Sequence, residues 1–105
     1  MTDDRQSPWT ASGDPASGEV KITGEVDFTN SQAVRDWLKD FARTCPGEVL
    51  LDLSELQYID SSGLAVLIEV RKAMLAGKRS LRITAATTQV HKLFDLTQIG
   101  ELFGL

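Results

Sequence analysis

The sequence has 105 residues, of which 42% are hydrophobic and 25% are charged, and its formal net charge is −4 at pH 7. This composition is typical of a single globular domain. The absence of a basic excess disfavours direct binding to DNA or RNA, because Lys and Arg side chains that neutralise phosphates supply most of that affinity.

Membrane-spanning, secreted and disulfide-linked classes are also disfavoured. The longest unbroken apolar run, residues 64–68, is far shorter than the ~20 residues that a membrane-spanning helix needs. The first residues lack the basic start and apolar stretch of a secretion signal. Cys45 is the only cysteine, which excludes an internal disulfide and a cysteine-based zinc site. We therefore expect a cytoplasmic protein without a membrane span, a metal or another cofactor.

The N-terminal part of the chain predicts a hairpin. Residues 1–17 are rich in Ser, Thr, Asp, Gly and Pro, which indicates a ragged terminus with a possible edge strand near residues 9–12. Residues 19–23 alternate polar and apolar side chains and predict a half-buried strand that ends at Gly24. The main domain is expected to span residues 18–105.

An amphipathic helix is predicted after residues 27–31, which contain several candidate N-caps. Apolar side chains recur there at helical spacing, at Val34, Trp37, Leu38 and Phe41. The helix should end before Pro46 and Gly47, because proline disfavours helical geometry in the preceding residue and glycine allows the turn.

The second half of the chain predicts a parallel crossover. The apolar run 49–53 is typical of a strand covered on both faces, and residues 80–84 form a weaker candidate strand. Between them lies an apolar helix from about Gly63 to Ala76, and strand, helix, strand in that order implies a right-handed parallel connection. A third helix is predicted over residues 87–96, with Thr87 or Thr88 as its cap.

These elements predict an α/β domain. We expect a mixed, open β-sheet of four to five strands, with an N-terminal hairpin, parallel βαβ crossovers and three or more helices. The pattern leaves one question open: Val66, Val70 and Met74 either pack on the sheet or form an apolar patch for a partner.

Catalysis has few candidate residues in this sequence. His91 is the single histidine, and no serine or cysteine at fixed spacing marks it as part of a triad. The carboxylates Asp52, Asp60 and Asp95 are more typical of caps and solvated faces than of a Mg²⁺ site or an acid–base pair. Glycine-rich phosphate loops are absent. We therefore expect a protein that is not an enzyme.

One segment favours a modification site. Residues 58–64 read Tyr-Ile-Asp-Ser-Ser-Gly-Leu and open directly into the apolar helix. The simplest interpretation is an N-cap, because Asp and Ser side chains accept hydrogen bonds from the free amides of a first turn. In the functional interpretation, a hydroxyl at a helix N-terminus is a place where a phosphate is tolerated. Phosphorylation there would change binding without unfolding the domain.

Four blocks of the sequence carry a family resemblance. In chain order they are Gly24-Glu25-Val26-Asp27, residues 49–53, Ile59-Asp60-Ser61-Ser62-Gly63-Leu64 and Leu93-Phe94-Asp95-Leu96-Thr97-Gln98-Ile99-Gly100. Together they resemble STAS domains, especially bacterial anti-sigma factor antagonists, over about residues 18–105. The resemblance implies a STAS-like fold and a partner-switching regulator.

The resemblance also implies roles for individual residues. Ser61 matches the serine that is phosphorylated by an anti-sigma factor, a GHKL-type serine kinase, and Asp27 matches an aspartate near the nucleotide of that kinase. The expected partner surface is Asp27, Asp60, Ser61, Ser62, Gly63 and Leu64, with Ser62 capping the helix. The unphosphorylated form would bind the anti-sigma factor and free the sigma factor, and a serine phosphatase would reset the cycle.

A second resemblance leaves another function open. Relatives of the sporulation and stress type commonly read Gly-Leu-Gly where this chain has Gly63-Leu64-Ala65, which resembles the small STAS subunit of a bacterial lipid-transport ABC complex. In that role the same face would dock on the ATPase of the complex, without phosphorylation. Ser61 directly after Asp60, together with the block that begins at Leu93, favours the antagonist.

Overall fold

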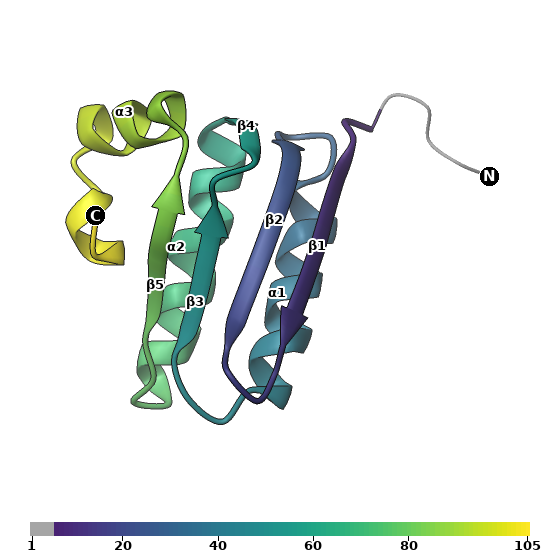
Figure 1. Ribbon diagram of the computed structural model, residues 1–105, viewed down its shortest axis with the longest axis vertical. Helices are drawn as coiled ribbons and strands as arrows, with labels where there is room; N and C mark the ends of the chain where they lie inside the picture. Colours follow the sequence, from purple (N-terminus) through teal and green to yellow (C-terminus); the bar gives the residue numbers. More distant parts are fainter. Residues whose placement is uncertain (1–5) are drawn as a thin grey trace.

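The computed structural model describes residues 6–105, so the first five residues of the expected ragged segment lie outside it. The elements, in chain order, are β1 (Trp9–Asp14), β2 (Glu19–Val26), α1 (Ser31–Thr44), β3 (Val49–Leu53), β4 (Leu56–Ile59), α2 (Ser61–Ala76), β5 (Leu81–Ala86), α3 (Thr88–Thr97) and the 3₁₀ helix η1 (Gly100–Phe103). Figure 1 shows the strands side by side in one sheet.

The sheet is mixed, as predicted. Its order is β1-β2-β3-β5, and β4 also pairs with β2. β1 runs antiparallel to β2, with Trp9 opposite Gly24 and Asp14 opposite Glu19, whereas β3 and β4 run parallel to β2 and β5 runs parallel to β3. β3 and β4 follow one another along β2. The N-terminal hairpin, the parallel crossovers and the predicted number of strands and helices are thus confirmed.

The core lies between the sheet and the two long helices, which both pass behind the sheet in Figure 1. Along β3, Val49, Leu51 and Leu53 are buried, whereas Leu50 and Asp52 on the other face are half-buried. The prediction that β3 is covered on both faces is therefore wrong, because α1 and α2 cover the same side. Val66, Val70 and Met74 are buried members of the core, so they pack inward and form no exposed patch.

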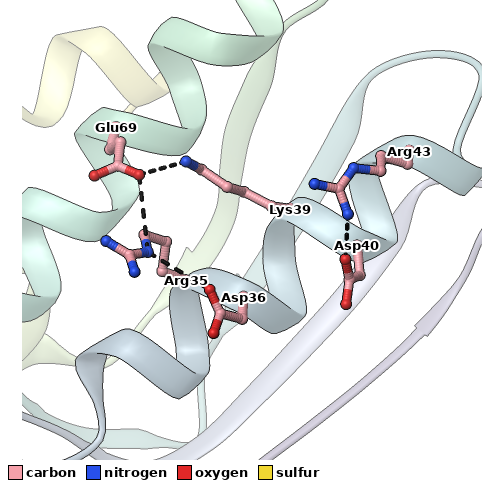
Figure 2. Close-up of polar contacts among 6 residues, drawn as sticks. All are labelled: Arg35, Asp36, Lys39, Asp40, Arg43 and Glu69. Carbon is pink, nitrogen blue, oxygen red and sulfur yellow. Dashed lines mark hydrogen bonds and ion pairs between the residues drawn. The ribbon is translucent and has the colours of Figure 1, made fainter.

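Exposed ion pairs join α1 and α2 on the outer side of the helix layer (Figure 2). Glu69 on α2 lies 2.5 Å from Lys39 and 3.9 Å from Arg35, both on α1. The hydrogen bond from Lys39 holds the pKa of Glu69 below its ordinary value. Such exposed pairs add little stability, so the apolar side chains beneath them hold the helices on the sheet.

The prediction that β2 ends at Gly24 is wrong, because the strand continues to Val26. Gly24 has a φ of +89°, and a Cβ added there would lie 2.3 Å from the carbonyl oxygen of Pro8. The register between β2 and β4 shifts directly after this residue, which marks a bulge. The glycine therefore permits a bend and a close backbone approach inside the strand.

β4 is absent from the predicted elements. Its buried residues, Leu56 and Ile59, are separated by the exposed Gln57 and Tyr58, so the alternation that predicts a strand is missing. Pairing with β2 nevertheless gives the segment extended geometry. Because β2, β4 and β5 are aligned in one direction, their carboxyl ends lie at one side of the sheet, at the top of Figure 1. We call this side the carboxyl edge.

Replacing Gly24 tests the bulge. Gly24→Ala should destabilise the domain by at least about 1 kcal/mol, because alanine is strained at positive φ and its Cβ would clash with backbone. Gly47→Ala is the matched control, since nothing lies within 4 Å of a Cβ added at that position. Urea unfolding measures both changes. Equal losses in the two variants would contradict the role of Gly24.

Candidate functional site

The first turn of α2 is capped by Asp60, which follows β4 directly. Asp60 Oδ1 accepts hydrogen bonds from the amides of Ser62 at 2.9 Å and Gly63 at 3.2 Å. These bonds satisfy amides that a helix start leaves free. The expectation that Ser62 caps the helix is wrong, because Ser62 lies inside the first turn and the side chain one residue before the helix reaches the free amides.

The two serines of the turn differ in exposure. Ser61, the first residue of α2, is exposed, whereas Ser62 is half-buried. The hydroxyl of Ser61 therefore stands at the positive end of a 16-residue helix. Because Asp60 already occupies the amides of the turn, a phosphate on Ser61 would lie outside those bonds and beside a carboxylate.

Gly63 and Leu64 face the protein interior. A Cβ added at Gly63 would lie 2.5 Å from Ile59 Cγ1 and 2.9 Å from Val26 Cγ1, so the glycine allows α2 to approach β2 and β4 closely. The side chain of Leu64 is 7% exposed. These two residues set the position of Ser61 relative to the sheet, and Leu64 also lines the groove described below.

Asp27 lies in the loop between β2 and α1, residues 27–30, where its carboxylate makes local hydrogen bonds. Oδ2 accepts a bond from the Ser7 hydroxyl at 2.5 Å, and Oδ1 accepts bonds from the Thr29 amide at 2.9 Å and hydroxyl at 2.5 Å. The Ser7 hydroxyl first, and then Thr29, hold the pKa of Asp27 below its ordinary value. The ionised carboxylate thus stabilises this loop.

Asn30 anchors the same loop and is almost fully buried, at 1% exposure. Its side chain accepts a bond from the Asp27 amide at 3.0 Å and donates to the carbonyls of Ser7 at 3.0 Å and Glu25 at 2.7 Å. It makes no cap bond to α1, although it occupies the N-cap position. The candidate cap residues of the sequence therefore fasten the loop to β2 and to the segment before β1.

Asp60 also connects the two loops of the carboxyl edge. Its second oxygen, Oδ2, accepts a bond from the Phe28 amide at 3.2 Å, and its own amide donates to the Val26 carbonyl at 3.1 Å. The structure thus brings the loop that contains Asp27 next to Asp60 and Ser61, which lie more than thirty residues later in the sequence. Sequence reasoning missed Phe28, which is 78% exposed and whose amide makes this bond to Asp60.

An apolar groove opens beside Ser61, between β4 and α3. Its volume is about 460 Å³, and its lining residues are Gln57, Tyr58, Ile59, Asp60, Ser61, Leu64, Gln89, Val90, Leu93 and Thr97. Thr87 holds α3 in place, because its hydroxyl accepts a bond from the Val90 amide at 3.2 Å and donates to the Leu56 carbonyl at 3.3 Å. Thr87 is therefore the cap that the sequence left open between two threonines.

The other polar residues considered for catalysis make ordinary local contacts. Asp52 accepts a bond from the Ser54 amide at 2.8 Å, and His91 lies 3.3 Å from Asp95 on the exposed side of α3. Within residues 6–105, no cluster of His, Cys, Asp and Glu side chains could hold a metal ion. The helices of this part of the chain include none long and apolar enough to cross a membrane.

The low pKa of Asp27 predicts a pH-dependent contribution to stability. A carboxyl whose folded pKa lies below its unfolded value stabilises the fold above that value, and the contribution is lost as the pH falls through the folded pKa. Asp27→Asn should therefore be less stable than wild type at pH 7, and the difference should shrink as the pH falls below the ordinary value of 3.8. Urea unfolding at a series of pH values measures it, and a pH-independent difference would contradict the assignment.

Comparison with known proteins places the chain in a family. The sequence model of the STAS domain matches residues 10–105. The anti-sigma-B factor antagonist of Staphylococcus epidermidis is 27% identical over 84 residues, which are 80% of this chain and 78% of that protein.

Two solved structures share the fold. An anti-sigma factor antagonist from Mycobacterium paratuberculosis superposes with a TM-score of 0.77 at 19% identity, over 100% of this chain and 89% of that chain. The Bacillus cell fate determinant SpoIIAA, in its phosphorylated form, superposes with a TM-score of 0.66 at 15% identity, over 90% and 87% of the two chains. Since the family match includes every helix and reaches into every strand described above, the chain belongs to the STAS domain family.

Proposed function

We propose that this protein is an anti-sigma factor antagonist, a non-catalytic regulator that acts in the cytoplasm. Its unphosphorylated form binds an anti-sigma factor, a GHKL-type serine kinase, and thereby frees the sigma factor. Phosphorylation of Ser61 releases the kinase, and a serine phosphatase restores the binding form. The names of the Staphylococcus epidermidis relative and of the Mycobacterium paratuberculosis structure support this proposal.

The observation that carries the proposal is the placement of Ser61. It is the exposed first residue of α2, while the neighbouring Asp60 keeps the helix capped. A kinase needs a hydroxyl that can enter its active site without unfolding the substrate domain. Ser61 meets this need, because the bonds that hold the turn are made by Asp60 and by the backbone.

The charge of a phosphate supports release of the partner. At pH 7 a phosphoserine adds about −1.5 to −2 charges, here next to the Asp60 carboxylate and on the same edge as Asp27. A partner that covers this edge would have to desolvate the added charge, which opposes binding. Moving an equilibrium from 1:99 to 99:1 requires about 5.5 kcal/mol, and burial of a doubly charged group in an interface is a source of that size.

The groove beside Ser61 supports the same location for the partner. Apolar side chains of Leu64 and Leu93 line it, and Ser61 is another of its lining residues. An apolar partner side chain that fills the groove would bring the surrounding partner surface over the acceptor hydroxyl. Binding and phosphorylation would then use one surface, so that modification of Ser61 acts directly on the contact.

Phosphorylation by the host's GHKL-type anti-sigma factor tests the proposal. With ATP, the wild-type protein should gain one phosphate, Ser61→Ala should gain none, and Ser62→Ala should gain one as the wild type does. Ser62 is the matched control, because it is the same residue type in the same turn. Intact-mass measurement and peptide mass spectrometry detect and locate the phosphate.

Two results would contradict the proposal. One is phosphate on Ser62 in the Ser61→Ala variant at the wild-type rate. The other is an unmodified wild-type protein that co-purifies from its host with the ATPase of a lipid-transport ABC complex, which would favour the transport subunit instead.

A further inference from the structure

Phe28 is an apolar side chain in an unusual place. It lies at the tip of the loop between β2 and α1, and its side chain is 78% exposed. An aromatic ring left in water loses the free energy that burial would provide. Its neighbours in the loop, Asp27 and Thr29, are polar and bonded to each other, so the loop itself needs no apolar residue at this position.

The backbone of Phe28 is held in place from two sides. Its amide donates to Asp60 Oδ2 at 3.2 Å, and the Asp27 carboxylate bridges over it to Thr29. Asn30, which lies two residues after Phe28 and is almost fully buried, anchors the loop to β2. The ring therefore projects from an ordered backbone. An anchor presented in this way loses less conformational entropy on binding than a residue on a flexible loop.

Asp60 relates Phe28 to the groove and to the acceptor serine. One carboxylate oxygen holds the Phe28 amide, and the residue itself lines the groove together with Ser61. On the far wall, Leu93 lines the groove, and Leu96, three residues further along α3, is 82% exposed. Residues three apart lie on neighbouring parts of a helix surface. Exposed apolar side chains thus lie on the loop that bonds to Asp60 and on α3, whose Leu93 lines the groove beside Ser61.

The charges of this edge indicate the chemistry of the partner surface. Asp27 and Asp60 accept bonds only from hydroxyl and amide groups. The ion pairs found within the described part of the chain lie elsewhere. A protein that covers Phe28 must also approach these two carboxylates. The complementary surface is an apolar pocket bordered by Lys or Arg side chains.

We propose that Phe28 is the anchor by which the anti-sigma factor recognises this protein, and that it inserts into an apolar, basic-rimmed pocket of the kinase while Asp60 holds its backbone. This inference rests on the proposed function. It assigns Phe28 a specificity-determining role that the family motifs do not carry, because Phe28 lies outside all four blocks of the family resemblance.

Binding of the purified anti-sigma factor to matched variants tests the anchor. Phe28→Ala should raise the Kd at least about tenfold, as expected for an aromatic hot spot, whereas Phe28→Tyr should keep it within about threefold because the ring remains. Leu75→Ala is the control, since Leu75 is 45% exposed near the opposite end of α2. Its Kd should stay within about twofold of wild type, as expected outside a hot spot. Isothermal titration calorimetry measures the Kd, and thermal unfolding checks that each variant is folded.

The outcomes separate this inference from the proposed function. If wild type binds and Phe28→Ala binds equally well, the anchor is refuted while the antagonist function stands. If Phe28→Ala and Leu75→Ala weaken binding to the same extent, Phe28 has no special role and the anchor is again refuted. If wild-type protein does not bind the anti-sigma factor at all, the proposed function fails and the anchor fails with it.

Discussion

One carboxylate joins the loops on which the proposed function depends. Asp60 uses one oxygen to cap α2 and the other to hold the Phe28 amide. Hydrogen bonds to a charged group are stronger than bonds between neutral groups, and here they meet on a single side chain. Ser61, the proposed phosphorylation site, and the exposed ring of Phe28 are therefore placed relative to one another by the half-buried side chain of Asp60.

The sheet makes this arrangement possible. Parallel strands bring their carboxyl ends to one edge, so the residues after β2, β4 and β5 become neighbours. The bulge at Gly24 keeps β2 paired with β4 up to this edge, and the missing side chain of Gly63 lets α2 start close to the sheet. Since Ser61 is exposed and is not a member of the buried core, a charge added there would change the surface and leave the packing of the domain intact.

Sequence patterns predicted the elements whose side chains follow a simple period. α1 has apolar residues at helical spacing, and the first part of β2 alternates polar and apolar side chains. β3 was predicted instead from its apolar run, and that run gave the wrong expectation that both of its faces are covered. β4 escaped prediction, because its two exposed residues are adjacent. The prediction that the strand ends at Gly24 is wrong, since a glycine after an alternating run is typical both of a bulge and of a strand end.

The candidate site, too, could be predicted from the sequence only in part. The turn that carries Ser61 was recognisable because its polar residues directly precede an apolar helix. The residue that caps the helix could not be identified from the sequence, because the choice between Asp60 and Ser62 depends on a shift of two residues in the helix start. Phe28 could not be found by periodicity, since it belongs to a loop, and its proposed role is inferred from its exposure and from its bond to Asp60, a residue far along the chain.

Amide hydrogen exchange in the Asp60→Asn variant, monitored by NMR, tests most directly whether the Asp60 carboxylate links the start of α2 to the Phe28 amide. Asparagine is as good an N-cap as aspartate, so the amides of Ser62 and Gly63 should remain protected. Its side-chain nitrogen cannot accept a bond from Phe28, whose amide should exchange at least about tenfold faster, as expected when a hydrogen bond to a charged group is lost. Unchanged protection of the Phe28 amide, or equal acceleration at all three amides, would contradict the account.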